Sequence, residues 1–193
     1  MDALAALTSR QSVAPAFLGE PGPDDAALER LLAAGASAPD HGRLRPWRFI
    51  VVRGEARNRL GEVFADALRR RQPDAPEPAL EQERKRPLRA PVLIAVAVRL
   101  QKDHPKIPEV EQILSTGAAV QNILLAAHAQ GFGAKWLTGD NAYDAHVQAA
   151  LGLAPDDRLV GFVHIGTIEG NPPAVPHADP REHAVEWEGP TSR

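Results

Sequence analysis

The sequence predicts an α+β sandwich in one domain, residues 1–193, built around a central sheet. Its organising segment is 107–137, where a long helix, apolar on nearly all sides, is followed by a short strand. A helix of this kind is expected to be buried. Two apolar runs, 92–98 and 159–168, flank that helix along the chain and are typical of buried strands. The sequence has no internal repeat, which favours a layered domain.

The N-terminal half is expected to hold three helices and one strand. Apolar residues at helical spacing mark the helices, and Asp24 or Asp25 is a suitable N-cap for the second one. The strand is rich in aromatic and β-branched residues and closes at Arg53-Gly54. In chain order the expected elements are a helix over 2–9, a helix from 24 to 37, a strand over 47–52 and a helix over 55–71.

The C-terminal half begins with a charged, proline-rich excursion over 72–91, whose middle, 79–86, is predicted to form a short exposed helix. The long helix starts at Pro108 and stops at Gly131, as helix ends favour. The remaining expected elements are strands over 92–98, 133–137 and 159–168, a helix over 142–151, and an extended C-terminal tail over 170–193.

Composition excludes several classes of protein. The 193 residues are 44% apolar and 24% charged, which is a globular composition, and the net charge of −3 gives no reason to expect nucleic acid as a partner. The chain has no cysteine, so disulfides and cysteine-ligated metals are excluded. The N-terminus lacks the apolar run of a secretory signal, and the long helix is poor as a membrane span. We therefore expect a cytoplasmic protein with no membrane partner.

The sequence lacks the motifs of several common catalytic and cofactor-binding sites. The closely spaced glycines, Gly131 and Gly133, follow a helix and precede a strand, which is the reverse of the dinucleotide-binding order. The sequence around Ser37 lacks the second glycine of a nucleophile elbow. The seven histidines show no His-Glu-x-x-His metal pattern, so no metal site is predicted.

Three other stretches carry a more specific signal. They are Arg10-Gln11-Ser12 after the first helix, APDHGRLRPW over 38–47 before the first strand, and GFGAKWLT over 131–138 after the long helix. In this order the stretches resemble the nitroreductase family of flavoproteins, and most of all its small single-domain bacterial NAD(P)H nitroreductase-like members. The resemblance covers nearly the whole chain. It implies a central mixed sheet wrapped by helices around a long buried helix, an intertwined homodimer, and one FMN at each of two sites shared between subunits.

The same resemblance assigns residues to the FMN site. Arg10, Gln11 and Ser12 match the family's phosphate and ribityl contacts, although many relatives carry arginine where Gln11 stands here. Ser37 and His41 match positions that contact FMN from the partner subunit. Trp136, Leu137 and Thr138 match a segment that lies against the flavin. No residue is predicted to be catalytic.

The resemblance implies ping-pong hydride transfer from NADH or NADPH through FMN to a nitroaromatic, a quinone or a similar small acceptor. Arg43 and Arg45 stand where the broader family has Asn and Gln, which suggests a more basic pocket suited to anionic substrates or to bracing the phosphate. Two alternatives stay open. One is a non-catalytic flavin-binding protein of the same fold, and the other is a cofactor-free hydrolase that uses Ser37 or Ser115 with a histidine.

Overall fold

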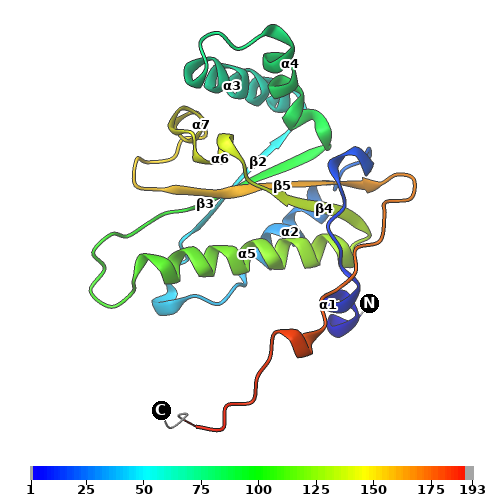
Figure 1. The fold of residues 1–193 in the computed structure, drawn as a ribbon, viewed down its shortest axis with the longest axis vertical. Helices are drawn as coiled ribbons and strands as arrows, with labels where there is room; N and C mark the ends of the chain where they lie inside the picture. Colours follow the sequence, from blue (N-terminus) through cyan, green and yellow to red (C-terminus); the bar gives the residue numbers. More distant parts are fainter. Residues whose placement is uncertain (1, 190–193) are drawn as a thin grey trace.

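A five-stranded sheet forms the centre of the fold in a computed structural model that describes residues 2–189 (Figure 1). The main path of the sheet runs β1-β5-β3-β2, and β4 pairs with the other edge of β5. β5 is therefore the central strand. The strands are β1 (Leu18–Gly19), β2 (Trp47–Arg53), β3 (Val92–Val98), β4 (Phe132–Leu137) and β5 (Arg158–Ile168).

Helices cover both faces of this sheet. Figure 1 shows α2 and α5 on one face, and α3, α4, α6 and α7 on the other. The helices are α1 (Ala3–Ser9), α2 (Asp25–Ala36), α3 (Ala56–Arg71), α4 (Glu77–Lys85), α5 (Glu109–Ala129), α6 (Asp140–Tyr143) and α7 (Ala145–Ala150). Four short 3-10 helices are η1 (Pro15–Phe17), η2 (His41–Arg43), η3 (Arg86–Arg89) and η4 (Pro180–Glu182).

The strand pairing differs from the mixed sheet that the sequence suggests. Each pairing of these five strands is antiparallel. The long helix α5 does connect two strands of the same direction, β3 and β4, but β5 lies between them and pairs with both. Strands joined by a helix thus need not be neighbours, which the sequence pattern does not reveal.

Two apolar cores lie on the two faces of the sheet. Successive side chains of a strand point to opposite faces. In β3, Ile94 and Val96 pack toward α2 and α5, whereas Leu93 and Ala95 pack toward α3 and α7. All seven residues of β3 are buried, which confirms the prediction of a strand buried on both sides.

The long helix α5 is buried on one face only. Val120, Ile123 and Ala127 are fully buried against the sheet and α2. The opposite face leaves Val110 and Leu114 58% and 67% exposed. The expectation of a helix buried on nearly all sides is therefore wrong for a single chain. The apolar surface of α5 is therefore larger than the area that the rest of the chain covers.

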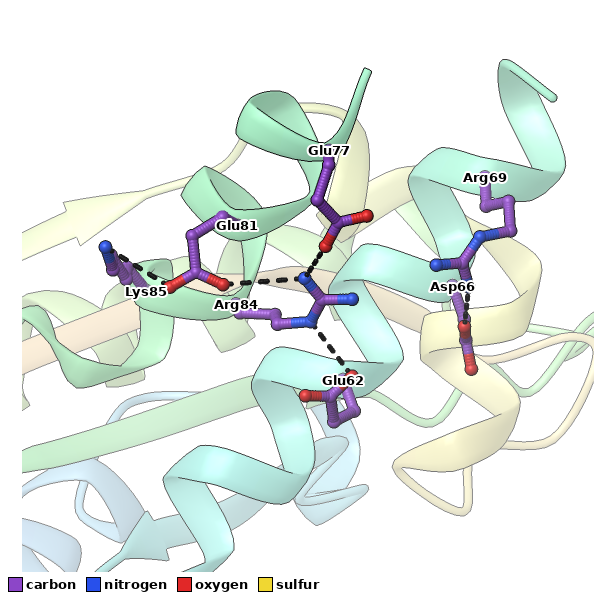
Figure 2. A network of polar contacts seen from close by, with 7 residues as sticks. All are labelled: Glu62, Asp66, Arg69, Glu77, Glu81, Arg84 and Lys85. Atoms are coloured by element: carbon purple, nitrogen blue, oxygen red, sulfur yellow. Dashed lines mark hydrogen bonds and ion pairs between the residues drawn. The ribbon is translucent and has the colours of Figure 1, made fainter. Parts of the chain in front are cut away.

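The charged excursion is folded onto α3. Arg84 of α4 donates to Glu62 of α3 at 3.1 Å and to Glu77 at 2.6 Å, and this network appears in Figure 2. Leu80 is buried, so α4 is amphipathic and not simply exposed as predicted. A Cβ atom on Gly61 of α3 would lie 2.3 Å from the carbonyl oxygen of Arg84, so only glycine admits this close approach.

The C-terminal region departs from the prediction in one place. The single helix expected over 142–151 is divided into α6 and α7, because the Asp144 carboxylate caps α7 by accepting from the N–H groups of His146 and Val147. In the tail, Val185 and Trp187 are 95% and 80% exposed. The last residues of the predicted tail, 190–193, lie outside the described part. Within residues 2–189, no helix has the length and apolarity needed to span a membrane.

Candidate functional site

The N-terminal motif lies beside β4 and the C-terminal end of α5. The backbone N–H of Val13 donates to the carbonyl of Ala134 at 3.0 Å, which holds the segment against the strand. One turn earlier, Ser9 Oγ and His128 Nε2 of α5 form a hydrogen bond of 2.8 Å. These contacts place Arg10, at the end of α1, close to both elements.

The motif's polar groups differ in what they already bind. Within residues 2–189, Arg10 forms no ion pair, and neither it nor the hydroxyl of Ser12 has a hydrogen-bonding side-chain partner. Gln11 is already bonded, since its side-chain Oε1 accepts from the backbone N–H of Val175 at 2.9 Å. An arginine and a hydroxyl thus remain available for an oxyanion, while Gln11 anchors the C-terminal tail.

The predicted segment from Trp136 to Thr138 forms the end of β4 and the turn after it. Trp136 is partly exposed, and its indole Nε1–H donates to the carbonyl of Val160 at 3.2 Å. That carbonyl is offered at a β-bulge in β5, where the register against β3 shifts. Leu137 is half-buried and Thr138 is exposed. Because Trp136 and Leu137 are consecutive in β4, their side chains lie on opposite faces of the sheet, and the exposed hydroxyl of Thr138 follows them.

The predicted residues Ser37 and His41 lie in the segment between α2 and β2. His41 Nδ1 is 2.6 Å from Oε2 of Glu111 in the first turn of α5. Arg43 and Arg45 adopt φ of 56° and 50°, a region that L-residues rarely occupy. Asp40 stabilises this conformation by accepting from the backbone N–H of Arg45 at 2.8 Å. Strain of this kind persists where surrounding contacts hold it and clusters at functional sites.

The structure does not bring all predicted residues together within one chain. Arg10, Gln11 and Ser12 lie at the C-terminal end of α5, whereas His41 contacts its N-terminal end. Twenty-one residues of helix separate these ends, a length of about 30 Å. His41 therefore cannot contact the same small molecule as the N-terminal motif within one chain. Ser37 lies nearer the middle of α5, because it follows the turn of α2 whose Ala34 carbonyl accepts from Asn122 at 3.1 Å.

The sequence analysis missed two residues with marked chemistry. Glu111 has no local motif, because its role depends on a contact 70 positions away. In the apolar strand β5, the titratable side chains are Arg158, at its start, and His164. A single histidine inside an apolar run is a feature that the sequence alone could have pointed out. Burial lowers the pKa of His164 to about 4, although the nearby carbonyls of Arg86 and Phe162 act in the opposite direction.

The geometry does not favour the hydrolase alternative. Ser37 Oγ donates to the carbonyl of Ala34 at 2.8 Å, which ties the hydroxyl to its own helix. Among residues 2–189, neither Ser37 nor Ser115 forms a hydrogen bond with a histidine. The serine–histidine pair that does form is Ser9 with His128, and no carboxylate in this described range orients that ring.

Comparison with known proteins gives a consistent result. Residues 7–167 match the profile of the Nitroreductase family. The chain is 38% identical over 167 residues to "Putative NAD(P)H nitroreductase YdjA" of Escherichia coli strain K12, covering 86% of this chain and 88% of that protein. It is 37% identical to a similarly named protein of Haemophilus influenzae, covering 86% and 89%.

Solved structures show the same fold. A nitroreductase-like protein from Bacillus cereus superposes with a TM-score of 0.80 at 23% identity, over 98% of this chain and 97% of that one. A Desulfovibrio desulfuricans protein, described as a nitroreductase in complex with FMN, gives a TM-score of 0.72 at 26% identity, with 97% of each chain covered. Both confirm the nitroreductase-like α+β architecture.

Proposed function

The chain belongs to the nitroreductase family, and on this premise we propose that it is an FMN-dependent oxidoreductase. In this proposal it passes a hydride from NADH or NADPH through FMN to a small acceptor such as a nitroaromatic or a quinone. The observation that supports it best is the match of residues 7–167 to the family, joined by relatives named as NAD(P)H nitroreductases. The relative crystallised with FMN supports the choice of flavin.

Several residues of this chain suit FMN. Arg10, whose guanidinium pairs with no carboxylate in residues 2–189, would bind the phosphate, since a planar guanidinium suits an oxyanion. The hydroxyl of Ser12 would form a hydrogen bond with FMN beside the phosphate. Trp136 would supply an apolar wall for the ring, the backbone at Leu137 would contact the flavin, and Thr138 would supply a hydroxyl at its edge. Gln11 would contribute less than an arginine, because its Oε1 already accepts from Val175.

The second half of the site would come from a second copy of the chain. Val110, Ile113 and Leu114 form an exposed apolar stripe on α5, and a Cβ atom on Gly117 in the same helix would meet nothing within 4 Å. An obligate interface has this apolar character. If two α5 helices pack in opposite directions about a twofold axis, His41 and Ser37 of one chain approach Arg10 of the other. The proposed unit is thus a homodimer with two shared FMN sites.

The protein's part in the reaction would be binding, orientation and exclusion of water. FMN, when bound, supplies the hydride-accepting and hydride-donating chemistry. Arg10 and Ser12 would fix its phosphate end, and Trp136 would exclude water from one side of the ring. Holding the reacting atoms at contact distance and in the right orientation would then lower the barrier. No acid, base or nucleophile of the chain is needed, so we assign no catalytic side chain.

Two measurements on the purified protein test this function. We expect a yellow protein whose visible spectrum bleaches when NADH or NADPH is added without oxygen, and recovers when a quinone is added. A flavin spectrum that bleaches no faster than free FMN would favour the non-catalytic flavin-binding alternative. A colourless protein that does not take up added FMN would contradict the proposed function as a whole.

A further inference from the structure

The C-terminal tail is tied to the rest of the chain by one long-range hydrogen bond within its described part, residues 170–189. The backbone N–H of Val175 donates to Oε1 of Gln11 at 2.9 Å, across 164 positions of sequence. The other hydrogen bonds of the tail through residue 189 are local and join residues within 179–183. Most of this segment is exposed, so its position depends on the single contact with Gln11.

The direction of this hydrogen bond fixes the orientation of the Gln11 amide. A backbone N–H donates and cannot accept, so the amide atom that faces Val175 is the oxygen. Oxygen and nitrogen of an amide lie on the same carbon, so fixing the oxygen restricts where the two N–H groups of Nε2 can point. Among residues 2–189, Nε2 of Gln11 has no hydrogen-bond partner. Gln11 therefore accepts from the tail and keeps two donors for a ligand.

Gln11 shares a pocket with Arg10. Both residues line a cavity of about 100 Å³ between the segment that follows α1, the C-terminal half of α5 and β4. One water molecule occupies about 30 Å³ of liquid water, so this space suits a group of a few heavy atoms, such as a phosphate. Within residues 2–189, no carboxylate side chain lines the cavity, and Arg10 forms no ion pair. The pocket thus offers a positive charge and amide donors to an anionic group.

We propose that the tail orients Gln11 for FMN, so that docking of the tail and binding of FMN stabilise each other. The N–H of Val175 would hold Oε1 of Gln11, and Nε2 would donate to an oxygen of FMN beside Arg10. Val175 would be a positioning residue that acts through Gln11. This inference rests on the proposed function and adds a coupling between the cofactor and the tail. Two binding events coupled in this way strengthen each other by the same factor.

The proposed bridge requires an amide at position 11. Arginine has only donors and could not accept from Val175, whereas an ionised glutamate has only acceptors and could not donate to FMN. Glutamine accepts on one atom and donates from the other. Substitutions of Gln11 can therefore remove either end of the bridge or both.

Dissociation constants of FMN, measured by fluorescence titration of protein freed of flavin, test the bridge from the tail side. Val175→Pro removes the N–H and should weaken FMN about threefold to tenfold, the effect of one hydrogen bond. Ala174→Pro is the matched control, because it removes an N–H that has no partner among residues 2–189, and it should bind FMN normally. Both positions are exposed, so the core is not disturbed. A Val175→Pro protein that binds FMN no more weakly than Ala174→Pro overturns the proposal.

A double-mutant cycle tests whether Val175 acts through Gln11. Gln11→Met removes both ends of the bridge, so Val175→Pro should cause no further loss of FMN affinity in that background. Losses that add would show that the tail acts by another route and would overturn the proposal. Gln11→Glu keeps an acceptor for Val175 but removes the donors, and it should weaken FMN at least tenfold. Unweakened binding by Gln11→Glu would show that Nε2 does not face FMN.

Hydrogen exchange of the Val175 amide, followed by NMR, gives a reading that does not depend on FMN affinity. FMN should slow this exchange by about the factor that Val175→Pro costs in FMN binding, and it should have no such effect in Gln11→Met. An exchange rate that does not respond to FMN in the unsubstituted protein overturns the coupling. An unsubstituted protein that binds FMN without these effects contradicts this inference alone. One that binds no FMN contradicts the proposed function as well.

Discussion

At the residue scale, His164 is a buried imidazole whose protonation opposes folding. Its folded-state pKa of about 4 lies below the ordinary value of 6.5, so between these pH values the unfolded chain binds more protons than the folded one. Stability then rises with pH through this window, and the contribution is lost as the pH falls. The other titrating groups of the chain act over the same range, so a variant is needed to isolate the effect.

The prediction for His164 is a difference in pH dependence. The unsubstituted protein should lose about 2 kcal/mol of unfolding free energy at pH 5 through this group, and His164→Leu should lose that much less between pH 7.5 and pH 5. Urea denaturation of both proteins at the two pH values measures it. Parallel losses in the two proteins would show that the imidazole titrates normally in the folded state.

Glu111 carries the second residue-scale prediction. Its carboxylate accepts from Nδ1 of His41, which leaves Nε2 of that ring for a ligand. If His41 contacts FMN as proposed, Glu111→Gln should weaken FMN binding about fivefold to tenfold, the effect of one charge-assisted hydrogen bond. Fluorescence titration of FMN gives the dissociation constant. Glu109→Gln, two residues earlier in the same helix turn and exposed, serves as the control and should bind FMN normally.

At the scale of elements, the strands were the predictable part. The apolar run that forms β3 has no titratable residue, and the run that forms β5 has only His164 after its first residue, Arg158, so their burial follows directly from the sequence. The order of strands was not predictable, because β5 inserts between β3 and β4 through contacts distant in the chain. The left-handed conformations of Arg43 and Arg45 were also hidden, since arginine gives no local signal for them.

The site was predictable to the same extent. The three motifs identify segments that the fold places at the surface near α5, but the hydrogen bonds of His41 with Glu111 and of Gln11 with Val175 join residues far apart in sequence. No periodicity encodes such contacts. The break at Asp144 shows the same limit, because an aspartate within a helical pattern becomes an N-cap only when Arg71 and the following N–H groups surround it.

The packing of α4 on α3 gives a prediction for these two elements. In Gly61→Ala the new methyl group would clash with the carbonyl oxygen of Arg84, so α4 must move and disturb the ion pairs of Figure 2. We expect a loss of about 1–3 kcal/mol in unfolding free energy, although alanine normally favours a helix. Urea denaturation measures the loss. Arg59→Ala, at an exposed position of the same helix, should be nearly neutral. A stabilised Gly61→Ala protein would mean that α4 does not pack as described.

At the scale of the whole molecule, the exposed apolar face of α5 predicts assembly. Leu114→Glu places a charge in the proposed interface and should convert a dimer into a monomer, with loss of bound FMN, because each site would lose half its residues. Light scattering after size exclusion gives the mass, and the visible spectrum gives the flavin. Arg70→Glu, at an exposed position of α3, should remain a yellow dimer. A dimeric, FMN-bound Leu114→Glu protein would place the interface elsewhere.

The most direct test of the shared site is complementation between two damaged chains. One chain carries Arg10→Ala with Ser12→Ala, and the other carries Ser37→Ala with His41→Ala. Each alone should bind no FMN. Co-expressed under two different tags and purified as a heterodimer, they should bind one FMN per two chains, because one of the two sites then combines both intact halves. A heterodimer that binds no FMN, or homodimers that keep it, would contradict an FMN site built from two chains.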